Sequence, residues 1–144
     1  MYACWGGHVE LVRWLIDSCG ADIGATDVVG NTPLLYAIYG GHRIVVEELL
    51  RRGRSLRERN NKNHSAILQA ACGGHLELVE WLLEQGFSLA ETDNDGNTAL
   101  LFAAWGGHQH FMNTISFTCI GTNLHGVKMP NKTQIFLHFR PIHG

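Results

Sequence analysis

The tripeptide Gly-Gly-His occurs four times in this chain at nearly equal intervals. Its copies begin at Gly6, Gly40, Gly73 and Gly106, which are separated by 34, 33 and 33 residues. A period of this length is typical of stacked supersecondary units, each too small to bury its apolar face without its neighbours. The period therefore predicts a stack of similar units.

Each unit carries the signals of a tight turn followed by two helices. The turn is expected where Gly30, Asn63 and Gly96 recur, since glycine and asparagine tolerate positive φ. The first helix is expected to start soon after the turn, and the Gly-Gly pair is expected to end it. Its N-cap candidates are Thr32, Ser65 and Thr98.

The second helix of each unit is predicted from its apolar spacing. Val45, Val46, Leu49 and Leu50 recur at i, i+1, i+4 and i+5, which places them on one helical face. The same spacing returns in the next unit. The opposite, solvent-facing side is expected to hold Glu47, Glu48, Arg51 and Arg52.

Two segments carry a family resemblance. Asp27–Leu34 reads Asp-x-x-Gly-x-Thr-Pro-Leu, and Leu76–Gly86 reads Leu-Glu-Leu-Val-Glu-Trp-Leu-Leu-Glu-Gln-Gly. With the Gly-Gly-His copies, these segments resemble the ankyrin-repeat family over residues 1 to about 112. The resemblance implies an all-α fold, an α-solenoid of stacked antiparallel helix pairs with short β-hairpin loops.

The repeat boundaries follow from this alignment. We expect a partial repeat at 1–26, complete repeats at 27–59 and 60–92, a partial repeat at 93–117, and a non-repeat tail at 118–144. Met1 aligns with Leu35, inside the first helix of a repeat, so an upstream portion is expected to be missing. Leu35, Leu68 and Leu101 also stand where the family has histidine, so an apolar contact is expected there.

The C-terminal segment differs in composition from the repeats. Residues 1–112 hold eight Lys and Arg against thirteen Asp and Glu, whereas residues 113–144 hold three basic residues and no acidic one. The tail is a non-repeat cap, a disordered extension, or translated sequence that is not normally coding. It shows no periodic apolar face, which favours the last two interpretations and predicts an irregular, poorly ordered tail.

Several classes of function are not expected. The sequence has no apolar run long enough to span a bilayer and no signal-peptide layout, so we expect a cytoplasmic or nuclear protein with reduced thiols. Its near-neutral charge favours neither nucleic acid nor membrane as a partner. Phosphate-binding, dinucleotide-binding and nucleophile-elbow motifs are absent. The histidines of the four Gly-Gly-His copies are regularly separated, and the histidines toward the C-terminus show no compact His/Cys spacing of a metal site. We therefore expect a monomer without enzymatic activity, cofactor or metal.

A row of large side chains is one candidate partner surface. Trp5, Tyr39, Cys72 and Trp105 each stand directly before a Gly-Gly-His copy. In the family that the chain resembles, partners usually contact the loop tips and the exposed side of the first helices. Aromatic residues there are typical binding hot spots. The alternative is that these rings pack against a neighbouring helix.

The loop tips and a basic cluster complete the candidate surface. The tips hold Val28, Val29, Asn61, Lys62, Asn94 and Asp95. The cluster holds Arg54, Arg57, Arg59 and Lys62, which either meet an acidic segment or a phosphate, or are merely solvated.

The function predicted from these features is a non-enzymatic protein-interaction module that binds a protein or peptide. The alternatives are a regulatory or structural segment of a larger enzyme or channel, and a truncated product without independent function.

Overall fold

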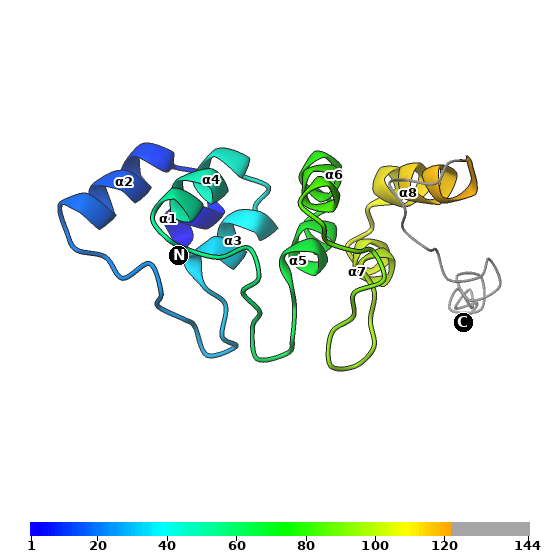
Figure 1. Ribbon diagram of the computed structural model, residues 1–144, viewed down its shortest axis with the longest axis horizontal. Coiled ribbons are helices and arrows are strands. Elements are labelled where there is room, and N and C mark those ends of the chain that lie inside the picture. Colours follow the sequence, from blue (N-terminus) through cyan, green and yellow to red (C-terminus); the bar gives the residue numbers. More distant parts are fainter. Residues whose placement is uncertain (122–144) are drawn as a thin grey trace.

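Four pairs of antiparallel helices follow one another along the chain (Figure 1). The computed structural model describes residues 1–121. The first helices of the pairs are α1 (Tyr2–Trp5), α3 (Pro33–Tyr39), α5 (Ala66–Cys72) and α7 (Ala99–Trp105). The second helices are α2 (Val9–Asp17), α4 (Arg43–Arg51), α6 (Leu76–Glu84) and α8 (Gln109–Gly121).

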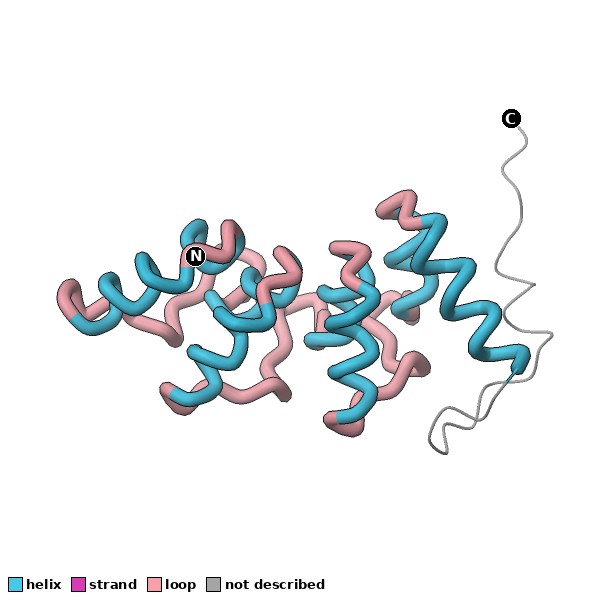
Figure 2. The backbone as a smooth tube through the Cα atoms, turned by 90° about the horizontal axis from the view of Figure 1, so that it is seen from above, coloured by secondary structure: helices cyan, strands magenta, loops and turns pink. Residues whose placement is uncertain are grey.

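The helices form two layers. The first helices pack side by side in one layer, and the second helices lie over them in the other (Figures 1 and 2). Loops between the pairs project from the first-helix layer, on the side away from the second helices. Within residues 1–121 the only β-type pairing is one bridge between Thr92 and Thr98. The all-α solenoid predicted from the sequence is confirmed.

The turn signals act as predicted. Gly30 and Gly96 have φ of +84° and +80°, and Asn63 takes the same left-handed conformation at +65°. In each loop the residue three positions before this turn residue accepts a hydrogen bond from its backbone N–H. The loops are therefore tight turns placed in register by the repeat.

The cap prediction holds in only one of three copies. Thr32 Oγ1 accepts a hydrogen bond from the Leu35 N–H at 3.3 Å, and Pro33 is the first residue of α3. Ser65 and Thr98 make no side-chain cap bond. The Ser65 hydroxyl is buried without a hydrogen-bond partner in the described part of the chain. A cap residue type alone was not enough to predict the bond.

The second helices bury the face that the spacing predicts. Val45, Val46 and Leu49 are buried in α4, and Leu50 is half-buried beside them. The equivalent side chains of α6 follow the same pattern. The core thus lies between the two layers and runs the length of the stack.

Glu48 is the exception on the face predicted to be solvated, because its side chain is buried. It accepts hydrogen bonds from Arg13 at 3.1 Å, Arg51 at 2.9 Å and Arg52 at 2.8 Å. These bonds, above all the one from Arg52, lower the pKa of Glu48 although burial opposes the shift. The buried carboxylate joins α4 to α2 through Arg13.

Leucine replaces the family histidine as expected. Leu35 and Leu68 are each 1% exposed, so an apolar side chain is buried at this position in the two central copies. Leu101 is half-buried.

The last helix is longer than the others. Helix α8 has 13 residues against nine in each of α2, α4 and α6, and it reaches Gly121, four residues beyond the expected repeat boundary at 117. The rest of the predicted tail, residues 122–144, lies outside the described residues.

Candidate functional site

The row of side chains before Gly-Gly-His occupies the last position of each first helix. Trp5, Tyr39, Cys72 and Trp105 end α1, α3, α5 and α7, so the repeat places them in register. Trp5 is 48% exposed, Tyr39 37% and Trp105 63%. All three rings are partly exposed, and Tyr39 is the most buried of them. We call these four residues the aromatic row, with Cys72 as its gap.

The aromatic residues three positions before the row, Tyr2, Tyr36 and Phe102, are buried to different extents. Phe102 is buried and meets the Trp105 ring edge-on, with ring centroids 5.5 Å apart. Tyr36 is half-buried, but Tyr2 is exposed. Of these three rings, only those of Tyr36 and Phe102 are therefore packed against other described residues to a large extent.

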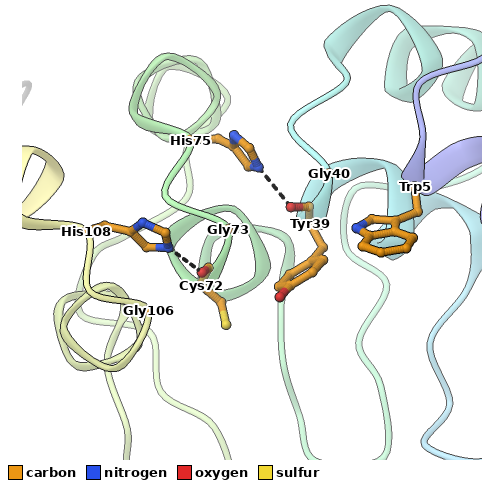
Figure 3. Close-up of a pocket in the computed structure, with 8 residues that line it drawn as sticks. All are labelled: Trp5, Tyr39, Gly40, Cys72, Gly73, His75, Gly106 and His108. Atoms are coloured by element: carbon orange, nitrogen blue, oxygen red, sulfur yellow. Dashed lines mark hydrogen bonds between the residues drawn. The ribbon is translucent and has the colours of Figure 1, made fainter.

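A groove of about 370 Å³ runs along this edge of the stack (Figure 3). Trp5 and Tyr39 lie beside each other on one side of it, and Cys72 and His108 lie on the other. Trp105 is not among the residues that line it. The lining residues are Trp5, Tyr39, Gly40, Cys72, Gly73, His75, Gly106 and His108.

Two histidines that line the groove form hydrogen bonds to the preceding repeat. His75 Nε2 donates to the carbonyl oxygen of Tyr39 at 2.9 Å, and His108 Nε2 donates to that of Cys72 at 2.8 Å (Figure 3). A carbonyl oxygen only accepts, so each Nε2 carries the proton. Each bond joins a repeat to the last first-helix residue of the preceding repeat. We call this bond the inter-repeat latch.

The glycine pair makes room for the latch. A Cβ at Gly73 would lie 2.3 Å from the Tyr39 carbonyl oxygen, and a Cβ at Gly41 would lie 2.4 Å from His75 Nδ1. Sequence reasoning assigned these glycines to turns alone and missed the contact between repeats. The sequence signal for this contact was the recurrence of both glycines and the histidine together in consecutive copies.

Two titratable groups of the groove are held neutral near pH 7. Burial lowers the pKa of His75, and its hydrogen bond to Tyr39 offsets this only in part. Burial also raises the pKa of the Cys72 thiol. Neither group therefore places a charge in the groove at neutral pH.

The loop tips differ in how far they are exposed. Val28 is 97% exposed, whereas Val29 is half-buried and its carbonyl oxygen accepts the Asn61 N–H at 2.9 Å. The next loop repeats this link, from the Asn94 N–H to the Lys62 carbonyl at 3.1 Å. Asp95 is exposed beside Asn94. The predicted tip residues thus form one continuous row of loops.

Asp27 fixes the first of these loops. Its carboxylate accepts the Tyr36 hydroxyl at 2.8 Å, the Val29 N–H at 2.9 Å, and the backbone and side-chain N–H of Asn31 at 2.8 and 3.1 Å. Burial opposes ionisation, but these hydrogen bonds outweigh it and lower the pKa of Asp27 to about 2. The ionised form is therefore the one that the fold stabilises.

Acid should remove this stabilisation in a defined range. Because the folded pKa of about 2 lies below the ordinary value of 3.8, the contribution is present above about pH 4 and is lost as the pH falls toward 2. We expect Asp27→Asn to flatten the fall of the urea midpoint over that range. Asp95→Asn, at an exposed tip, is the control. An Asp27→Asn chain that loses as much stability as the wild type between pH 4 and 2 would contradict this assignment.

The basic cluster is largely engaged within the chain. Arg54 pairs with Glu58 at 2.6 Å, and Arg59 pairs with Glu91 at 2.9 Å. The Arg57 guanidinium lies over the Phe87 ring, 4.6 Å from its centroid. In residues 1–121 these contacts leave Lys62 as the one member without a carboxylate or ring partner. The structure does not bring the cluster together as a free basic surface.

Two other classes of site find no support within the described residues. No three His, Cys, Asp or Glu side chains converge there as metal ligands would. No helix in residues 1–121 has the length and apolar character needed to cross a membrane.

Known proteins match the same features. A family model described as "Ankyrin repeats (3 copies)" matches residues 1–89, and a second, "Ankyrin repeats (many copies)", matches residues 64–117. The mouse protein "Ankyrin repeat domain-containing protein 63" is 40% identical over 64 residues, which is 44% of this chain and 16% of that protein. The matched segment thus spans about a sixth of the length of that relative.

Proposed function

Because the chain belongs to the ankyrin-repeat family, whose repeats are generally protein-interaction modules, we propose that it binds a protein or peptide along the groove and the adjoining loop tips. The module acts without catalysis, as a monomer and inside the cell. The observation that carries the proposal is the exposure of Trp5 and Tyr39 beside a groove.

Aromatic rings at such a position suit a binding site. They offer a large, rigid contact area with few rotatable bonds, and truncating a hot-spot ring typically costs ~1–3 kcal/mol of affinity. Three of the eight residues that line the groove are glycines, so a bound segment can approach the backbone closely there. The remaining two elements of the surface, Trp105 and the exposed Val28, extend it toward the last repeat and the loops.

Selection of binders from a random display library tests the proposal directly. Peptides selected on the full chain are titrated against Trp5→Ala, Tyr39→Ala and Trp105→Ala. We expect losses of ~1–3 kcal/mol for the first two, and a loss for Trp105 only where a peptide extends past the groove. Ile44→Ala is the matched control, since Ile44 is also exposed but lies on α4.

Thermal unfolding of each variant separates binding from folding. Tyr39 is more than half buried, so its truncation is expected to cost some stability as well. If the selected peptides bind the two groove variants as tightly as they bind Ile44→Ala, the groove is not the binding surface.

A further inference from the structure

The arginines of the repeats are already neutralised within the chain. Six of the seven arginines in residues 1–121 lie within ion-pair distance of a carboxylate. The seventh, Arg57, lies over the Phe87 ring. Little positive charge is therefore left in this part of the chain to meet an acidic partner.

Carboxylates, in contrast, are left over. Six of them lie in no ion pair with another described side chain: Asp22, Asp27, Glu77, Glu80, Glu84 and Asp95. Three of the six stand on the exposed side of α6, and Glu77 lies in its first turn, two residues after the groove residue His75. The uncompensated charge of the repeats is negative.

The groove itself has the chemistry that suits a cation. The rings of Trp5 and Tyr39 line one side of it, and none of its lining residues is a lysine or arginine. An aromatic face attracts a guanidinium or ammonium group, and the apolar stem of such a side chain packs on the ring. Cys72, a smaller side chain than the aromatic residues of the row, lines the opposite side of the groove.

Building on the proposed function, we infer that the groove takes a basic peptide segment, with an arginine or lysine side chain seated on Trp5 and Tyr39 and with Glu77, two residues after the lining residue His75, as the nearest unpaired carboxylate along the chain. The charge complementarity of the two surfaces steers the segment to the groove, and the rings fix the position of its cation. The partner class is thus a basic segment of another protein.

Three labelled peptides of equal length and Gly-Ser background test the inference on the full chain. They differ only in carrying three arginines, three glutamines or three glutamates, and binding is followed by fluorescence anisotropy. We expect the arginine peptide to bind at least about tenfold more tightly than the glutamine peptide, and the difference to shrink as salt is raised. The glutamate peptide should bind most weakly.

Variants assign the effect to the groove. Trp5→Ala and Tyr39→Ala should each weaken the arginine peptide roughly three- to tenfold, while Tyr39→Phe, which keeps the ring, retains the affinity. Ile44→Ala is the neutral control. Glu77→Gln should weaken binding more than Glu84→Gln, at the far end of the same helix.

The outcomes separate this inference from the proposed function. Equal binding of the arginine and glutamine peptides overturns it, and so does arginine binding that ignores both rings. If library peptides depend on Trp5 and Tyr39 but carry no basic residue, the proposed function stands and the inference fails. If the wild type binds no arginine peptide, while the chain with Lys128→Gln, Lys132→Gln and Arg140→Gln does, the basic C-terminal segment is the occupant. That result would contradict the inference that the groove binds a basic segment of another protein.

Discussion

Replacing Leu82 by alanine is expected to lower the free energy of unfolding by ~2–5 kcal/mol. Leu82 is fully buried in α6 and belongs to the continuous core between the two helix layers. The cavity left by the missing side chain cannot be filled without moving a helix. Domains of this size have a total stability of ~5–15 kcal/mol, so the loss is a large share of it. Leu49→Ala, at the same position of α4, should behave alike.

Urea denaturation followed by helical circular dichroism measures this effect. Leu15→Ala is the matched control, because Leu15 is the same repeat position in the first copy and is only half-buried. Its loss should be clearly smaller. A Leu82→Ala chain with an unchanged urea midpoint would mean that this helix face is not the core.

Gly73→Ala is expected to destabilise the stack by about 3 kcal/mol, at the upper end of overpacking costs. The added methyl group would lie 2.3 Å from the Tyr39 carbonyl oxygen, which is backbone of the preceding repeat. Neither atom can rotate away, so α3 and α5 must separate and the latch from His75 must lengthen. The substitution should therefore weaken one interface between repeats rather than one helix.

The same residue in the first copy provides the control. A Cβ at Gly6 would lie 2.9 Å from the movable His8 ring and 3.4 Å from the Tyr2 carbonyl oxygen, and its near contacts include no atom of another repeat. Gly6→Ala should thus cost much less in a thermal unfolding experiment. Equal losses for the two variants would show that the glycine is required within its own repeat and not by the neighbouring one.

The helices were predictable because their signals are local. The spacing of Val45, Val46 and Leu49 places them on one apolar helix face. Glycine and asparagine tolerate positive φ, so Gly30 and Asn63 indicate tight turns. Caps were less predictable: Thr32 and Ser65 are similar residues in equivalent places, yet only Thr32 has a bond to its own helix. Thr32 also donates to Glu58 at 2.6 Å, a partner 26 residues away that no local pattern indicates.

The candidate site was predictable in part. The recurrence of Trp5, Tyr39 and Trp105 in the repeat gave the row, and the structure supplies their exposure. The ion pairs of Arg54 and Arg59 could not be predicted, because a long flexible side chain can reach a carboxylate several residues away or in the next loop. Whether a charge is free or paired depends on packing between repeats, which a linear pattern does not record.

The inter-repeat latch sets which changes of chain length this architecture can accept. Each latch joins atoms of two consecutive copies, so one residue inserted between Gly73 and His75 would carry the ring away from the Tyr39 carbonyl. Gain or loss of an entire copy instead leaves each remaining latch histidine opposite a carbonyl oxygen of the preceding copy. The first interval between Gly-Gly-His copies is one residue longer than the other two, and because α2 and α4 have equal lengths, the extra residue lies in the loop after α2, outside any latch. Such a chain can therefore lengthen by whole-unit duplication, whereas single insertions are confined to its loops.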